Sequence, residues 1–181
     1  MSKFFLSARK NLRANSSGQA AVELAMTTVI LLVLMCAAAD FGCALNDMQI
    51  LSELTRQGSN LASRGTTLAQ TNADLLAGDS GLGLSSNGRV VVTQLTQTTP
   101  RAGGPYTVAA QAYSLTGISQ TSKVAPSGGG TITLTGAPAL QTGQSLFVTE
   151  IFYKYTALTG IGALTGGAVG MPSVLYDVAY F

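Results

Sequence analysis

The stretch that decides the fold of this chain is Gly18-Gln19-Ala20-Ala21-Val22-Glu23-Leu24, where a basic N-terminal segment meets a long apolar run. No charged residue lies between Leu24 and Ala39. The Glu23 carboxylate stands at the start of this run. A charge placed there is costly in lipid, so it needs a partner and is functional by default. The stretch therefore predicts a membrane helix with one functional acid near its N-terminal end.

The composition of the chain limits what the rest of it can be. Its 181 residues allow one modest domain and an appendage. Charged residues make up 10% and aromatic residues 7%, so the surface is polar but weakly charged and the core is thin. Four of the ten basic residues precede Gly18, which leaves six basic against eight acidic residues after it. This balance excludes nucleic acid as a partner because no basic patch remains.

The basic segment predicts the orientation of the chain. Residues 1–18 contain Lys and Arg but no acid, and short basic segments beside an apolar helix stay in the cytoplasm. We therefore expect a cytoplasmic N-terminus and an extracytoplasmic C-terminal domain. The expected organisation is a leader at 1–18, a transmembrane helix at 19–46, an amphipathic helical continuation at 47–77 and a β-rich domain at 78–181.

The apolar helix is expected to continue beyond the membrane. Apolar or small residues recur at alternating spacings of three and four, which is the pattern of one helix face: Leu51, Leu54, Gly58, Leu61, Gly65 and Leu68. We expect one helix from about Gln19 to Ser63, roughly 65 Å long. Gly58 and Gly65 would let a sheet approach this face closely. Asp40 is expected near the outer membrane interface, in contact with water, and a further short helix is expected at 67–77.

The remainder of the chain is typical of short strands separated by Gly and Pro. The predicted strands are Arg89–Gln97, Tyr106–Leu115, Thr131–Thr135, Gln144–Ala157 and Val174–Phe181. Short connections favour antiparallel pairing. Because 144–157 is apolar on both faces, it should lie inside the sheet with one face against the long helix. Arg89 and the Thr-rich strand suit an edge. The predicted fold class is α+β, a long N-terminal transmembrane and amphipathic helix packed on a small antiparallel sheet.

The junction also carries a processing hypothesis. Ser16-Ser17-Gly18 offers a small, accessible and extended site at which a peptidase could cut before Gln19. The cut would create a new amine on Gln19, four residues from Glu23. The amine of one copy could then lie against the Glu23 carboxylate of the next, an attractive pair in low dielectric. Such a pair would set the register between subunits.

This junction resembles that of a known family. Residues 18–24, the apolar helix and Asp40-Phe41-Gly42 look like the TadE-like family, the pseudopilins or minor pilins of the tight-adherence (Flp, type IVb) pilus. The resemblance is strongest over residues 17–65 and implies a pilin-like architecture in the bacterial inner membrane or in the pilus. It implies cleavage between Gly18 and Gln19 by a membrane prepilin peptidase. Glu23 and Leu24 would act in assembly with other pilins, pseudopilins and the assembly machinery.

A second processing signal supports an alternative function. Ala37-Ala38-Ala39 before Asp40 resembles a conventional signal peptidase site. A cut there would release a secreted domain, and an extracellular adhesin or binding module would then use Tyr106, Tyr113 and the loop 159–172 as contacts. The simpler interpretation is that both tyrosines pack in the sheet and the loop is a flexible tip.

Enzymatic chemistry is not expected. The chain has no histidine, which removes Ser-His and Cys-His pairs and the usual metal sites, so we expect no catalytic residue, cofactor or metal. Asp74 and Asp79 are interpreted as helix-end and turn residues. Glu150 and Lys154 are interpreted as a solvated or cross-strand pair.

The two cysteines fall in the predicted apolar helix. Cys36 and Cys43 would be roughly 10 Å apart along a helix, too far for a disulfide within one chain. Apolar packing in the membrane and a cross-link between neighbouring copies both remain open.

Overall fold

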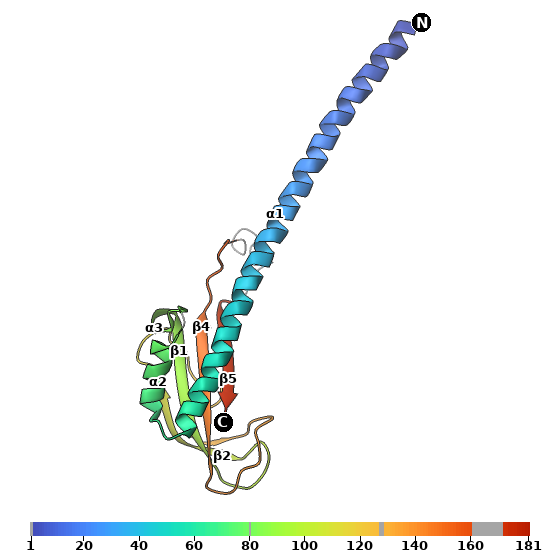
Figure 1. Cartoon of the computed structure of the whole chain (residues 1–181). Coiled ribbons are helices and arrows are strands. Elements are labelled where there is room, and N and C mark those ends of the chain that lie inside the picture. The colour runs from blue at the N-terminus through green and yellow to red at the C-terminus, as the bar shows by residue number, and fades with distance from the viewer. Residues whose placement is uncertain (1, 80, 127–128, 161–171) are drawn as a thin grey trace. The chain divides into compact units, whose positions relative to one another are not determined.

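The computed structural model describes residues 2–79, 81–126, 129–160 and 172–181, with side-chain surroundings from Gly18 onward. Its elements are helices α1 (Ser2–Ser63), α2 (Leu68–Ala77) and α3 (Leu84–Asn87), and strands β1 (Gly88–Gln97), β2 (Tyr106–Tyr113), β3 (Thr131–Ile132), β4 (Ser145–Lys154) and β5 (Val174–Tyr180) (Figure 1). The chain divides into two compact units. One contains α1 up to Gly42, and the other runs from Cys43 to Thr156 and includes β5.

The strands form one five-stranded antiparallel sheet in the order β3-β2-β1-β4-β5. The predicted α+β class is confirmed, and β4 lies inside the sheet as expected. The Thr-rich segment supplies the edge strand β3. The expectation for Arg89 is wrong because this residue lies in β1, the central strand. Val90, Val91 and Val92 are fully buried and carry β1 into the centre, while the Arg89 guanidinium lies 5.0 Å from the centre of the Tyr113 ring.

Successive side chains along each strand point to opposite faces of the sheet. Other parts of the chain cover both faces. On one face Thr149 lies against α1 and α2. The opposite face holds the apolar cluster Leu95, Tyr106, Ala137, Leu146 and Val148. Side chains of the connections that follow β2 and β3, including Val124, Leu134 and Leu140, pack on this cluster. We call the first surface the helix face and the second the loop face.

The second half of α1 packs on the helix face through small and polar residues as well as leucines. Leu51, Leu54 and Ala62 are buried. The Ser59 hydroxyl accepts a hydrogen bond from Thr149 N (3.1 Å) and donates one to Ala179 O (2.8 Å). Thr149 and Ala179 face each other across β4 and β5, so Ser59 joins the helix to both strands.

Close approach of α1 to the sheet depends on Gly58, as predicted. A Cβ atom at Gly58 would lie 2.7 Å from Leu75 Cδ1 and 2.9 Å from two side-chain atoms of Thr149. These distances are well inside van der Waals contact, so a larger side chain would force the helix away from the sheet.

Replacing Gly58 should therefore destabilise the domain. We expect Gly58→Leu to lower the free energy of unfolding by about 2–3 kcal/mol, because overpacking outweighs the gain in helix propensity. The matched control is Gly42→Leu, since a Cβ at Gly42 meets nothing within 4 Å. Thermal unfolding of the detergent-solubilised chain, followed by circular dichroism, measures both. A Gly58→Leu protein as stable as the control would contradict this packing.

The end of α1 is partly as expected. The helix ends at Ser63, and the short second helix is confirmed as α2, with the Thr67 hydroxyl accepting from Gln70 N at its start. The interpretation of Gly65 as a packing residue is wrong. Gly65 is exposed with φ +94°, and a Cβ there would meet nothing. Its left-handed backbone follows the end of the helix, a position that favours glycine.

Candidate processing and assembly segment

The part of α1 that begins at Gly18 is long and apolar enough to cross a membrane. Its most apolar window has a mean hydropathy of 2.3 and is not buried within the chain. Large apolar side chains are exposed all around the helix: Val22, Leu24, Met26, Val29, Ile30, Leu31, Leu32, Leu34, Met35 and Phe41. A helix that is apolar on every side is matched to lipid or to other apolar helices rather than to water.

The predicted scissile bond lies inside a helix. We expected the helix to start near Gln19 and Ser16-Ser17-Gly18 to be extended, and both expectations are wrong because α1 begins at Ser2. The sequence Asn15-Ser16-Ser17-Gly18 nevertheless consists of weak helix formers, so this turn is inexpensive to unwind. Gly18 is exposed and a Cβ there would meet nothing within 4 Å.

Gln19 and Glu23 are brought together on the surface of α1. Gln19 Nε2 donates a hydrogen bond to Glu23 Oε1 at 3.0 Å, and both residues are exposed. Leu24, beside Glu23, is 69% exposed. The Thr27 and Thr28 hydroxyls donate to the backbone carbonyls one turn earlier, each at 2.8 Å, and so need no outside partner. The Glu23 carboxylate thus faces outward in an otherwise apolar region.

The far end of the apolar segment differs from the prediction. Asp40 is only 4% exposed, because Thr159 N (2.9 Å) and the Thr159 hydroxyl (2.5 Å) both donate to its carboxylate. The expectation that Asp40 meets water is therefore wrong. Its partner lies 119 residues away in sequence, which no local pattern indicates. Most of the predicted loop 159–172 lies outside the described residues.

Neither of the two tyrosines that the adhesin alternative would use as contacts is fully exposed. Tyr106 is fully buried and its hydroxyl donates to Pro138 O at 2.9 Å. Tyr113 is half-buried against Arg89. The prediction that both tyrosines pack in the sheet is confirmed.

The two aspartates that could have suggested acid–base chemistry have structural positions. Asp74 lies in α2, where its side chain accepts from Gln70 Nε2 at 2.8 Å. Asp79 accepts from Gly81 N at 3.2 Å and from Leu84 N at 2.7 Å, which stabilises the turn before α3. Their interpretation as helix-end and turn residues is confirmed.

The surroundings of Glu150 differ most from those predicted. It was expected to be solvated or paired across strands, but it is fully buried on the loop face. Its carboxylate accepts hydrogen bonds from the Ser122 hydroxyl, Lys123 N (2.8 Å), Val124 N (3.2 Å) and the Tyr176 hydroxyl (2.9 Å). Burial and the Glu150 charge raise the pKa of Tyr176, so its hydroxyl stays protonated and donates. Lys154 is exposed.

The Glu150 contacts fix the connection that follows β2. Besides the two backbone N–H groups, Lys123 places its Nζ 3.8 Å from the centre of the Tyr176 ring. Ser122 also accepts from Ala125 N at 2.8 Å, which closes a tight turn above the carboxylate. Glu150 therefore attaches segment 122–125 to the loop face.

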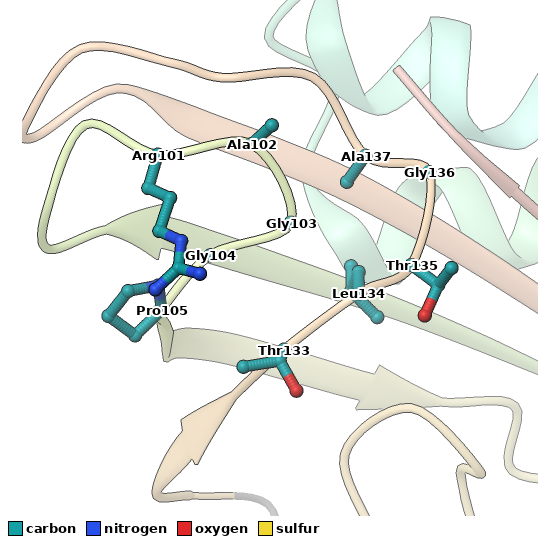
Figure 2. Close-up of a pocket in the computed structure, with 10 residues that line it drawn as sticks. All are labelled: Arg101, Ala102, Gly103, Gly104, Pro105, Thr133, Leu134, Thr135, Gly136 and Ala137. Atoms are coloured by element: carbon teal, nitrogen blue, oxygen red, sulfur yellow. The ribbon is translucent and has the colours of Figure 1, made fainter.

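An open pocket of about 620 Å³ lies between two loops near one end of the sheet (Figure 2). It is lined by residues 101–105 and 133–137, and Arg101 is its one charged lining residue. Figure 2 shows Arg101 among the residues that line the pocket. The buried Gln97 fixes the first loop by donating to Thr99 O and Arg101 O, both at 2.6 Å. The lining contains no acid, and within the described parts of the chain no cluster of His, Cys, Asp or Glu could hold a metal.

Within the described residues, one exposed apolar helix that is long enough to cross a membrane continues into an antiparallel sheet domain, which defines the class of this protein: an α+β protein with an N-terminal helix suited to membrane anchoring. Residues 18–60 match the family model described as TadE-like protein, which confirms the resemblance over the segment that contains Gly18, Gln19, Glu23 and Leu24. A TadE-like segment indicates a protein associated with the tight-adherence pilus. No curated protein and no solved structure matches the chain.

Proposed function

We propose that this protein is a pseudopilin or minor pilin that takes part in assembling a Flp-type pilus. The observation that carries the proposal is the TadE-like match over residues 18–60, which contains the exposed apolar part of α1. Its partners are other pilins or pseudopilins, the assembly machinery and a prepilin peptidase. Deleting its gene from the source bacterium should abolish surface Flp pili seen by electron microscopy, and the intact chain should restore them. Normal piliation after deletion would contradict the proposal.

In this proposal the peptidase cuts between Gly18 and Gln19. The preceding Asn-Ser-Ser-Gly turn of α1 is easy to unwind into a peptidase, since each of these residues is a poorer helix former than alanine. The alternative site after Ala39 lies in Ala37-Ala38-Ala39, which consists of the strongest helix formers and lies deep inside α1. Local helix strength thus favours the first site over the second.

Cleavage changes the electrostatics of the helix start. It removes Lys3, Arg9, Lys10 and Arg13 and leaves one ammonium group on Gln19. In the low dielectric at the membrane edge, this ammonium and the Glu23 carboxylate of a neighbouring copy attract each other strongly. The basic leader keeps the N-terminus in the cytoplasm before cleavage, which places the sheet domain outside the inner membrane.

Replacing Glu23 tests the register pair. We expect Glu23→Gln to reduce pili at least about tenfold because the opposite charge for the neighbour's ammonium is lost. Its contacts in the chain are local to α1, so processing and thermal stability should be unchanged. The readouts are the intact mass and the number of pili per cell. Asp74→Asn, at an exposed acid of α2 outside the apolar helix, is the matched control. Normal piliation in Glu23→Gln would exclude the register pair.

The proposed role is not enzymatic. The chain contains no histidine. Two acids are buried within the described residues, and both bind other parts of the chain: Asp40 binds Thr159, and Glu150 binds segment 122–125. The function instead depends on two surfaces, the apolar helix and the exterior of the sheet domain.

A further inference from the structure

Strand β5 has an open edge. Phe147 and Phe181 exchange both backbone hydrogen bonds, at 3.0 and 2.9 Å, next to the β4–β5 pairing. Because bonding alternates along an antiparallel strand, the odd-numbered residues of β5 bond to β4. The N–H and C=O groups of Val174, Tyr176, Val178 and Tyr180 then point away from the sheet. Within the described residues, no other strand pairs with this edge.

The edge lacks several of the features that protect such strands. Natural edges are shortened, bulged or marked with Lys or Pro to prevent pairing with another chain. The opposite edge, β3, is protected in this way because it has only two residues. β5 has seven residues, no Lys and no Pro. Its one charge, Asp177, is used inside the domain, where it accepts from the Thr55 hydroxyl at 2.6 Å.

A groove runs beside this edge. One hollow of about 500 Å³ is lined by Arg56 and Asn60 of α1 and by residues 178–181. A second, of similar volume, is lined by residues of α1 alone: Glu53, Arg56, Gln57, Asn60, Leu61 and Arg64. Arg56 and Asn60 line both hollows, so the two are adjacent, one at the edge of β5 and one on the exposed side of α1, and we call them together the groove.

The groove carries two positive charges without acidic partners. Arg56 and Arg64 are exposed, and no ion pair is formed by either within the described part of the chain. Glu53 is the one acid on the lining. A chain laid along β5 would pass in front of Arg56, so its affinity should depend on an acidic side chain at that point.

We propose that this groove binds an extended, acidic segment of another protein, which adds a strand to β5 and places a carboxylate against Arg56. Main-chain hydrogen bonds would supply affinity, and the arginine would supply specificity. The inference adds a second interface to the proposed function and does not depend on cleavage at Gly18.

A second copy of this chain fits the groove poorly. The β3 edge of that copy's sheet has only two residues, and the segment around it, 131–135, carries no charge that could pair with Arg56. The β5 edge of a second copy also offers no acid for Arg56, because Asp177, the one acid of β5, accepts from the Thr55 hydroxyl inside its own domain.

The experiment uses the full chain in nanodiscs of neutral lipid and three fluorescent peptides. The first alternates Thr and Val and carries two Glu, the second replaces both Glu with Lys, and the third has a central Pro. Fluorescence anisotropy should show saturable binding of the Glu peptide, at least about tenfold weaker binding of the Lys peptide, and no binding of the Pro peptide. Arg56→Glu should reverse the preference. Arg101→Glu, on an exposed loop outside the groove, is the matched control.

A backbone variant tests the edge itself. Val178→Pro removes one outward N–H and leaves the bonds to β4, so it should abolish peptide binding. The Val178 side chain also packs on the loop-face cluster, so Val178→Ala, which shortens this side chain but keeps the N–H, is the control and should still bind the peptide. If Val178→Pro is unstable, the reversed peptide preference of Arg56→Glu still tests the proposal. Equal binding of the Glu and Lys peptides, or no saturable binding of the Glu peptide, would overturn the proposal. The proposal would also be overturned if the full chain associated with itself and Val178→Pro abolished this association. The groove would then bind a second copy of the chain.

Discussion

A Gly18→Leu protein will accumulate uncut in the membrane. Gly18 is exposed and a Cβ there meets nothing in the chain, so the substitution should not disturb folding. The resemblance to TadE-like proteins implies a peptidase that accepts glycine before the scissile bond. A branched side chain would displace that bond in the peptidase and slow cleavage on the order of a hundredfold. The intact mass of the membrane-extracted protein measures the cut fraction.

The matched control for this prediction is Gly42→Leu. Gly42 lies in the same helix and its Cβ position is equally open, so this variant should mature normally. The uncut Gly18→Leu protein keeps its basic leader and has no ammonium on Gln19, so it should also fail to support pili. Appearance of the normal mature mass in Gly18→Leu would exclude cleavage at this bond.

Replacing Glu150 should produce the largest loss of stability. In Glu150→Ala, the N–H groups of Lys123 and Val124 and the hydroxyls of Ser122 and Tyr176 lose their shared acceptor on the loop face. Removing one member of a buried polar network of this kind costs about 3–5 kcal/mol. For a chain of this size, the corresponding fall in Tm is roughly 10 °C. Thermal unfolding in detergent measures it.

Two comparisons make the Glu150 prediction specific. Glu53→Ala, an exposed acid on α1, should change stability by no more than about 0.5 kcal/mol. Glu150→Gln keeps the shape of the side chain but turns an NH₂ group toward donors, so it should lie between the two. A Glu150→Ala protein with the stability of Glu53→Ala would show that segment 122–125 is not fixed by this carboxylate.

Local patterns predicted the elements of this fold well. The end of the long helix at Ser63, the second helix, the antiparallel strands and the interior place of β4 all follow from periodicity and turn residues. The close approach at Gly58 was also predictable, because a glycine on an apolar stripe indicates contact with a neighbouring backbone.

What the sequence could not predict are contacts between distant segments. Asp40 is bound by Thr159, and Glu150 by segment 122–124, so both acids are buried although each looks solvated in its local sequence. Arg89 lies in the central strand, where its guanidinium contacts the Tyr113 ring and donates to Ile118 O. Ser59 interrupts the apolar stripe, yet its hydroxyl joins two strands. In each case, tertiary hydrogen bonds or ring contacts outweigh residue polarity.

The candidate site rests on residue type and spacing, and the roles given to its residues stay predictions. Gly18, Gln19, Glu23 and Leu24 lie inside the TadE-like match. The helical state of Ser16-Ser17-Gly18 was not foreseen. A turn of weak helix formers between two strong helical segments is held helical by its neighbours, because helix formation is cooperative.

The most direct test of the account is the N-terminal sequence of the mature protein isolated from its own membrane, supported by its intact mass. The account predicts a polypeptide that begins at Gln19 and has lost residues 1–18. A mature protein that begins at Asp40, or one that retains Met1 in cells that carry pili, would contradict it.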